Sequence, residues 1–137
     1  ELFNIPVVAT GHANFGPLDD TMTSKHYSGV TVFMDKHTYS MVDERVDNHL
    51  REIGERRNQA VLYGGETHIC IRQTCLDLLE RDYKVFIVVD ATTSMTAYDR
   101  NVGLQDLKDT GARLATLESI AFDLLKSDQN PLFNDFL

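Results

Sequence analysis

The sequence is short of basic residues and of long apolar runs, and each shortage excludes a class of partner. Its 137 residues contain 13 Lys plus Arg against 21 Asp plus Glu, which gives a formal net charge of −8. Binding to nucleic acid or to an anionic membrane surface depends on clustered Lys and Arg, so we expect neither partner. The longest apolar run, Val85–Val89, is far shorter than the ~18 residues of a membrane-spanning helix.

Cysteine is also scarce, and the two cysteines do not form a pattern typical of disulfides. Cys70 and Cys75 are separated by about 500° of rotation on an α-helix, so they point in different directions. The sequence has no CxxC motif, and no charged-then-apolar signal peptide opens it. We therefore expect reduced thiols and an intracellular, cytoplasmic location, with a mitochondrial one left open.

Motifs of several common enzyme classes are absent. The five histidines show no HxH, HxxxH or HExxH spacing, so we predict neither a metal site nor another cofactor. No GxSxG, GxxxxGK[ST] or GxGxxG occurs, which argues against serine α/β-hydrolases, P-loop proteins and dinucleotide-binding folds. His12 and His68 lie close to predicted strand ends, but a surface position for His12 and a packing or surface role for His68 are the simpler interpretations.

The sequence does contain an alternation of strand-like and helix-like segments. This alternation implies βαβ units and therefore an α/β three-layer sandwich with a mostly parallel central sheet. We find no repeat and no linker, so we expect a single domain over residues 1–137. The predicted strands are Pro6–Thr10, Val30–Met34, Ala60–Tyr63, Val85–Val89 and Ala112–Ala115, and the predicted helices are Val42–Ile53, Cys70–Glu80, Asp99–Asp109 and Leu117–Leu125.

The segment from Tyr63 to Thr74 is the most informative for chemistry. A predicted strand ends at two glycines, the chain turns, and Cys70 opens a helix. The N–H groups and the dipole at a helix N-terminus lower the pKa of a thiol and can hold an oxyanion. A small side chain filling the strand–helix junction is the alternative for Cys70. Cys75 lies further along the helix and is predicted to be a core residue.

Lys36 is the second candidate because it follows the predicted strand Val30–Met34. The carboxyl ends of parallel strands meet at one edge of a sheet, so we expect Lys36 and Cys70 to be neighbours. A cation beside a thiol favours the thiolate. Taken alone, a Lys at this position is usually a solvated loop charge. The segment Gly11–Gly29 is the expected lid or specificity loop.

With these residues in view, the sequence resembles the isochorismatase-like cysteine hydrolase superfamily, and most of all its eukaryotic isochorismatase-domain-containing members. The resemblance covers the whole chain. It is most specific at Gly64-Gly65-Glu66-Thr67-His68-Ile69-Cys70, and it includes Lys36 with Tyr39-Ser40-Met41. It implies an amidohydrolase-type enzyme that acts on a small amide or a related carbonyl compound and associates as a homo-oligomer.

The resemblance also implies roles for individual residues. Cys70 would be the nucleophile and Lys36 the catalytic lysine, and the backbone N–H groups of Cys70 and Glu66 would form the oxyanion hole. A cis peptide would join Gly65 to Glu66. The metal-binding Asp-x-His set of nicotinamidases is not matched at Thr10–Phe15, which weakens a zinc-dependent interpretation.

The catalytic Asp of this superfamily has no counterpart here. It lies on the first strand of the fold, whereas this sequence opens as a helix end that runs directly into a strand. We therefore expect the first strand and the Asp to precede Glu1. Neither Asp35 nor Asp90 is assigned the role, and Asp90 is expected to cap a turn.

Two alternatives to an amide hydrolase stay open. A non-catalytic protein could keep the fold as an interaction or scaffold module, and the missing Asp segment favours that reading. A thiol-redox role for Cys70 is weaker, because Cys75 is not placed to act as a resolving partner.

Overall fold

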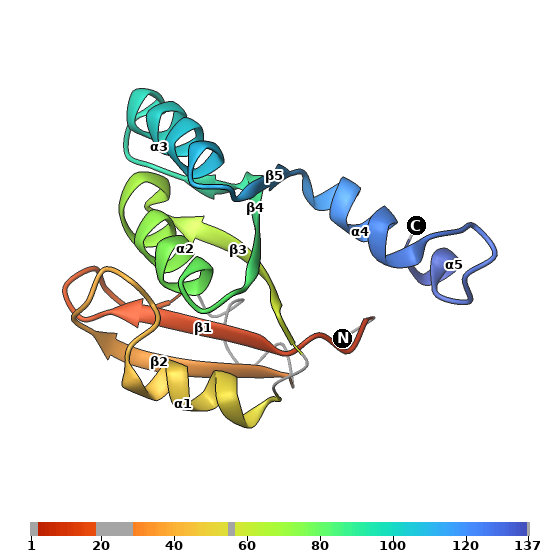
Figure 1. Ribbon diagram of the computed structural model, residues 1–137, viewed down its shortest axis with the longest axis horizontal. Helices are drawn as coiled ribbons and strands as arrows, with labels where there is room; N and C mark the ends of the chain where they lie inside the picture. The colour runs from red at the N-terminus through yellow and green to blue at the C-terminus, as the bar shows by residue number, and fades with distance from the viewer. Residues whose placement is uncertain (1–2, 19–28, 55–56, 137) are drawn as a thin grey trace.

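The computed structural model describes residues 3–18, 29–54 and 57–136. Strands and helices alternate along the chain, and every observed strand pair is parallel, which confirms the predicted α/β class (Figure 1). The strands are β1 (Val7–His12), β2 (Val30–Lys36), β3 (Gln59–Gly65), β4 (Lys84–Thr93) and β5 (Arg113–Ala115). The helices are α1 (Glu44–Glu52), the π-helical turn η2 (Thr67–Ile71), α2 (Arg72–Leu79), α3 (Ala97–Asp109), α4 (Leu117–Leu125) and α5 (Phe133–Phe136).

The strands form two sheets, whereas one continuous central sheet was expected. β1 pairs with β2, and β4 lies between β3 and β5. Among the described residues no ladder joins β1 to β3, so each of these strands has one unpaired edge. An unpaired strand edge leaves backbone N–H and C=O groups without partners. The strand expected from outside this chain would complete both edges, and that assignment stays a prediction.

The ends of several elements follow their local sequence signals. The Asp43 carboxylate accepts the Val46 N–H and caps α1, and Thr116 forms a capping box with Ser119 at the start of α4. Gly111 follows α3 with φ of 98°, a left-handed conformation that glycine adopts readily.

In contrast, β1, β2, β3 and β4 all extend beyond their predicted carboxyl ends. Gly64 and Gly65 in the extension of β3 are weak strand formers, yet they pair with Thr92 and Thr93 of β4.

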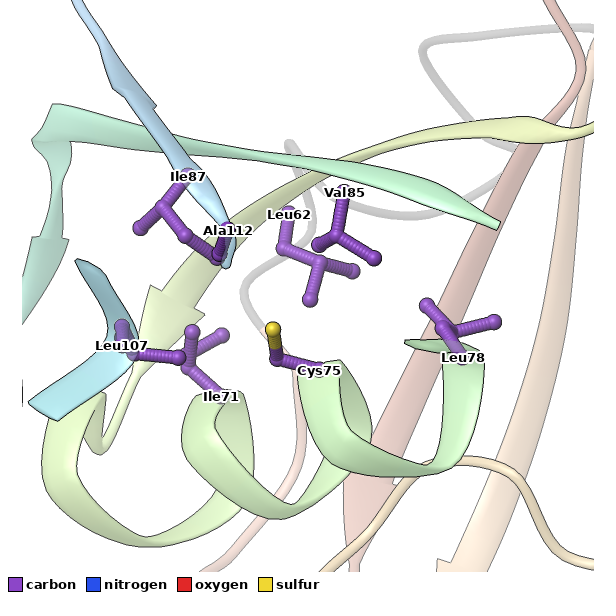
Figure 2. Close-up of a cluster of buried hydrophobic side chains, with 8 residues drawn as sticks. All are labelled: Leu62, Ile71, Cys75, Leu78, Val85, Ile87, Leu107 and Ala112. Atoms are coloured by element: carbon purple, nitrogen blue, oxygen red, sulfur yellow. The ribbon is translucent and has the colours of Figure 1, made fainter. Parts of the chain in front are cut away.

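A buried cluster fixes α2 against the sheet of β3, β4 and β5. Figure 2 shows Cys75 pointing from α2 toward the side chains of Leu62 and Val85. Burial raises the pKa of the Cys75 thiol to about 11. The prediction that Cys75 is a core residue is therefore confirmed. The full cluster is Leu62, Ile71, Cys75, Leu78, Val85, Ile87, Leu107 and Ala112.

The C-terminal helices extend from β5 to one side of the molecule (Figure 1). In this region the Phe122 ring lies edge-on to Phe136, with centroids 5.7 Å apart, and to Phe133 at 6.4 Å. Helix α5 has no counterpart among the predicted elements. Within the described ranges no helix has both the length and the apolar character that crossing a membrane requires.

Candidate active site

A bulge at the end of β2 turns Lys36 inward. Thr10 pairs with Phe33 and His12 pairs with Lys36, so β2 carries one more residue than β1 between these two pairs. The bulge contains Asp35, whose φ of 58° is left-handed. Such a bulge re-aims the side chains that follow it. Lys36 is 4% exposed as a result. It is a strand residue rather than the loop residue that was predicted.

Buried Lys36 is held by backbone carbonyls and is influenced by the charge of Cys70. Its Nζ donates to the carbonyl of Thr38 and, at 2.9 Å, to that of Tyr39. Burial lowers the pKa of Lys36, and the charges of Cys70 and Asp43 act against this and raise it. The charges of Lys36 and Cys70 thus act on each other, whereas the catalytic pairing of the two residues stays a prediction. Burial also rules out the alternative that Lys36 is a solvated loop charge.

Cys70 lies in the first turns of a helix but does not open it. The chain is helical from Thr67, and the π-helical turn η2 runs directly into α2. Thr67 is fully buried, and its hydroxyl donates to the Thr93 carbonyl at 2.8 Å, which fixes the start of the turn on the end of β4. The prediction that the helix begins at Cys70 is therefore wrong. Cys70 remains partly exposed, whereas Cys75 is buried.

The residue before this turn is held through both its backbone and its side chain. The peptide from Gly65 to Glu66 is cis, as the family resemblance implied. The Glu66 carbonyl accepts the N–H groups of Ile69 and Ile71, and its carboxylate accepts the Met95 N–H at 2.9 Å. Glu66 is therefore anchored to η2 and to the segment after β4. The role of the Glu66 and Cys70 N–H groups as an oxyanion hole stays a prediction.

A single hydroxyl ties the Lys36 loop to the Cys70 helix. Thr74 is 2% exposed, and its Oγ1 accepts the Met41 N–H at 2.9 Å. The same hydroxyl donates to the Cys70 carbonyl at 2.7 Å. Because Met41 closes the loop that wraps Lys36, the Thr74 hydroxyl sets the position of the lysine loop relative to Cys70.

Helix α3 packs directly on the turn that carries Cys70. A Cβ atom on Gly103 would lie 2.9 Å from the Cα, Cβ and N atoms of His68, so only glycine fits at this contact. The His68 ring shares a 3.1 Å hydrogen bond with the Ser94 hydroxyl and lies 3.9 Å from the Glu66 carboxylate. His68 therefore has structural contacts, which agrees with the packing role.

His12 ends β1, next to the strand that carries Lys36. It is partly exposed, so a surface position is not contradicted, and its pairing with Lys36 makes it a strand residue rather than a loop residue. Burial lowers the pKa of His12, and the charges of Lys36 and His37 lower it further. Its position at the end of a strand was the signal available in the sequence.

The structure shows no side-chain contact of Asp35 or Asp90 with Cys70 or Lys36 among the described residues, and it does not test the expected lid. Asp35 is exposed, and the Asp90 carboxylate accepts the Leu117 N–H at 2.9 Å, so it caps α4 rather than a turn after β4. In the part of the chain that the structure describes, no three His, Cys, Asp or Glu side chains are grouped as metal ligands would be. Most of the expected lid Gly11–Gly29 lies outside the described residues.

Comparison with known proteins gives consistent matches over most of the chain. The isochorismatase domain profile matches residues 3–119. The secreted isochorismatase effector Isc1 of Phytophthora sojae is 39% identical over 139 residues, a match that covers 97% of this chain and 65% of that protein. Isochorismatase domain-containing protein 1 of Danio rerio is 37% identical over 134 residues, covering 98% of this chain and 47% of that protein.

Solved structures match as well. The structure of MAR1 ribonuclease from Caenorhabditis elegans superimposes with a TM-score of 0.86 at 28% sequence identity, covering 98% of this chain and 68% of that one. The chain thus spans about half to two thirds of the length of these relatives.

Proposed function

The chain belongs to the isochorismatase family, and from this we propose that it hydrolyses a small amide or a related carbonyl compound with Cys70 as nucleophile. Family membership supports a hydrolase, whereas the cysteine mechanism and the C–N bond are our proposal. The observation that supports the proposal is the buried Lys36 ammonium, whose pKa the charge of Cys70 raises against the effect of burial. A positive charge beside a thiol stabilises the thiolate, which is the nucleophilic form.

The reaction would proceed through a thioester. The Cys70 thiolate attacks the substrate carbonyl carbon, and the new C–S bond leaves a negative charge on the carbonyl oxygen. Backbone N–H groups of Glu66 and Cys70 hold that oxyanion. The C–N bond then breaks, and the amine leaves with a proton from a carboxylic acid, the role that the family resemblance implies for its catalytic Asp. Water finally hydrolyses the thioester and returns the thiol.

The test is ammonia release from a panel of small amides. We expect activity in the wild type and in Cys75→Ala, which removes only the buried thiol. Cys70→Ser should lose at least about a thousandfold in rate, as loss of a nucleophile does. Lys36→Met should lose about a hundredfold or more, in line with removal of one electrostatic group from an active site. Full activity in Cys70→Ser would overturn the proposal.

The same assay separates other functions. The Caenorhabditis elegans relative is described as a ribonuclease, but a net charge of −8 does not favour RNA as a partner, so we expect no RNA cleavage. A scaffold protein would hydrolyse neither amides nor RNA. We also propose that the protein is a homo-oligomer.

A further inference from the structure

The turn that carries Cys70 is tied to the end of β4 by the side chains of three consecutive residues. Each link joins one residue of the turn to one residue at or just after the end of β4. The links run from the Thr67 hydroxyl to the Thr93 carbonyl at 2.8 Å, between the His68 ring and the Ser94 hydroxyl at 3.1 Å, and from the Met95 N–H to the Glu66 carboxylate at 2.9 Å. The Glu66 link has a carboxylate as its acceptor, and hydrogen bonds to charged groups are stronger than neutral ones.

The peptide group between Gly65 and Glu66 is held at both of its ends. On one side, Gly65 pairs with Thr93 in the ladder of β3 and β4. On the other side, the Glu66 carbonyl accepts the N–H groups of Ile69 and Ile71 in η2. The Glu66 carboxylate adds a third attachment, to the segment after β4. The direction of the Glu66 N–H therefore depends on these attachments, and the carboxylate is the one that a change of side chain removes.

The segment that this carboxylate contacts is itself fixed. Arg100 of α3 donates from Nε to the Thr92 carbonyl at 3.0 Å, near the end of β4. Thr96, which directly follows Met95, caps α3 by accepting the Asp99 N–H at 3.0 Å. The Met95 N–H therefore lies between a hydrogen-bonded strand end and a capped helix start. A donor on such a segment can hold the side chain that accepts from it in one orientation.

The charge of the Glu66 carboxylate indicates which kind of role it can have. A negative charge close to a developing oxyanion raises the energy of that oxyanion, so the carboxylate does not stabilise it directly. An oxyanion hole also depends on donors that are oriented before the reaction begins. The proposed function makes the Glu66 N–H one of those donors. A side chain that orients this N–H through the backbone would therefore raise the rate without touching the substrate.

We propose that the Glu66 carboxylate is a positioning group, whose hydrogen bond with the Met95 N–H orients the Glu66 N–H toward the oxyanion. The inference rests on the proposed function, because an oxyanion forms only if Cys70 attacks a carbonyl. It adds a side chain that acts on the reaction through the backbone, and it assigns the segment after β4 as the support of the oxyanion hole.

The test compares two reactions of the same thiol. In amide hydrolysis the Cys70 sulfur attacks a carbonyl carbon, and negative charge develops on the carbonyl oxygen. In alkylation by iodoacetamide the sulfur attacks the methylene carbon, a C–S bond forms and iodide leaves, so no charge develops on an oxygen. The ratio of kcat for the amide to the rate constant of alkylation therefore reports support of the oxyanion separately from reactivity of the thiol.

Three variants isolate the hydrogen bond of Glu66. Glu66→Ala removes the acceptor, and we expect kcat to fall roughly tenfold to a hundredfold, less than the about 10²–10³-fold cost of deleting an oxyanion donor outright. KM and the alkylation rate should stay near the wild-type values. Glu66→Gln keeps a side-chain oxygen for the Met95 N–H and should regain most of the lost kcat. Ser94→Ala removes the neighbouring link to His68 and should leave the ratio unchanged. If Glu66→Ala fails to fold, Glu66→Leu keeps the bulk of the side chain without an acceptor and takes its place.

The outcomes distinguish this inference from the proposed function. An unchanged ratio in Glu66→Ala, or an equal fall of hydrolysis and alkylation, would overturn the inference alone, since the second result is what a merely structural role produces. A kcat for Glu66→Gln as low as that of Glu66→Ala would show that the charge matters rather than the hydrogen bond, and an equal fall in Ser94→Ala would remove the special role of Glu66. If Cys70→Ser hydrolyses the amide as fast as the wild type, the proposed function itself is wrong and the inference fails with it.

Discussion

The substitution Thr74→Val removes the hydroxyl that joins the Lys36 loop to the Cys70 helix while keeping the shape of the side chain. It breaks the bond from the Met41 N–H and the bond to the Cys70 carbonyl. Each buried hydrogen bond contributes about 0.5–1.5 kcal/mol, so the free energy of unfolding should fall by about 1–3 kcal/mol. Thr74→Ser keeps the hydroxyl and loses only one buried methyl group, at a cost of about 1 kcal/mol.

Stability alone does not separate these two variants, but the reactivity of Cys70 does. Without the Thr74 hydroxyl the Lys36 loop loses its hydrogen-bonded link to the Cys70 helix, and the ammonium is held less firmly relative to the thiol. We therefore expect iodoacetamide to label Cys70 more slowly in Thr74→Val and at the wild-type rate in Thr74→Ser. Equal labelling rates in all three proteins would refute the positioning role of Thr74.

Four further predictions address the packing, the thiols, the helix cap and the assembly. Gly103→Ala should destabilise the protein and slow the labelling of Cys70, because the new methyl group meets the backbone of His68 in the turn that carries Cys70. The control Val102→Ala changes an exposed side chain and should have neither effect. Denaturant titration measures the stability, and alkylation kinetics measure the labelling. Peptide mapping after iodoacetamide treatment should find Cys70 modified and Cys75 unmodified, because a pKa of about 11 leaves little thiolate on the buried residue; preferential labelling of Cys75 would contradict the account. Asp43→Ala should cost about 1 kcal/mol in urea titrations, the usual loss for a helix cap. Burial raises the pKa of Asp43, but hydrogen bonds from the Arg45 side chain and the Val46 N–H more than offset this, so the pKa lies below its ordinary value. The stabilisation of the protein by the Asp43 carboxylate is therefore full above pH ~4 and is lost as the pH falls through the lowered pKa of Asp43. A polypeptide of these 137 residues alone should associate or precipitate, because β1 and β3 each have an unpaired edge in the described structure. Size-exclusion chromatography with light scattering measures its state of association. A stable monomer would show that no further strand is needed.

The parts of the fold that local sequence signals determine could be predicted. Thr116 before an apolar helix and Gly111 after α3 mark helix ends through their own side-chain or backbone chemistry, and both were placed correctly. Strand ends were underestimated, since Lys36, Gly64 and Gly65 become strand residues only when a neighbouring strand supplies their partners. The start of the Cys70 helix was misplaced for a related reason. Thr67 begins the turn because of its contact with Thr93, which lies far away in the sequence.

The candidate site was predictable in its main residues but not in their geometry. Cys70 and Lys36 were predicted to be neighbours because each follows a strand, but the two strands are not paired, since β2 pairs with β1 and β3 pairs with β4. His12 occupied an equivalent position but was set aside, since an isolated histidine gives no spacing signal. Its pairing with Lys36 depends on a bulge in β2, and the sequence alone does not indicate where a register shift occurs.

A thioester trapped on Cys70 would show directly that this thiol is the nucleophile. An active amide substrate is mixed with the protein, the reaction is quenched with acid during turnover, and the peptides are mapped by mass spectrometry. We predict that the peptide containing Cys70 gains the mass of the substrate acyl group, that this adduct is absent from Cys70→Ser, and that Lys36→Met forms it more slowly. Turnover that proceeds in Cys70→Ser, with no adduct on Cys70 in the wild type, would contradict the account.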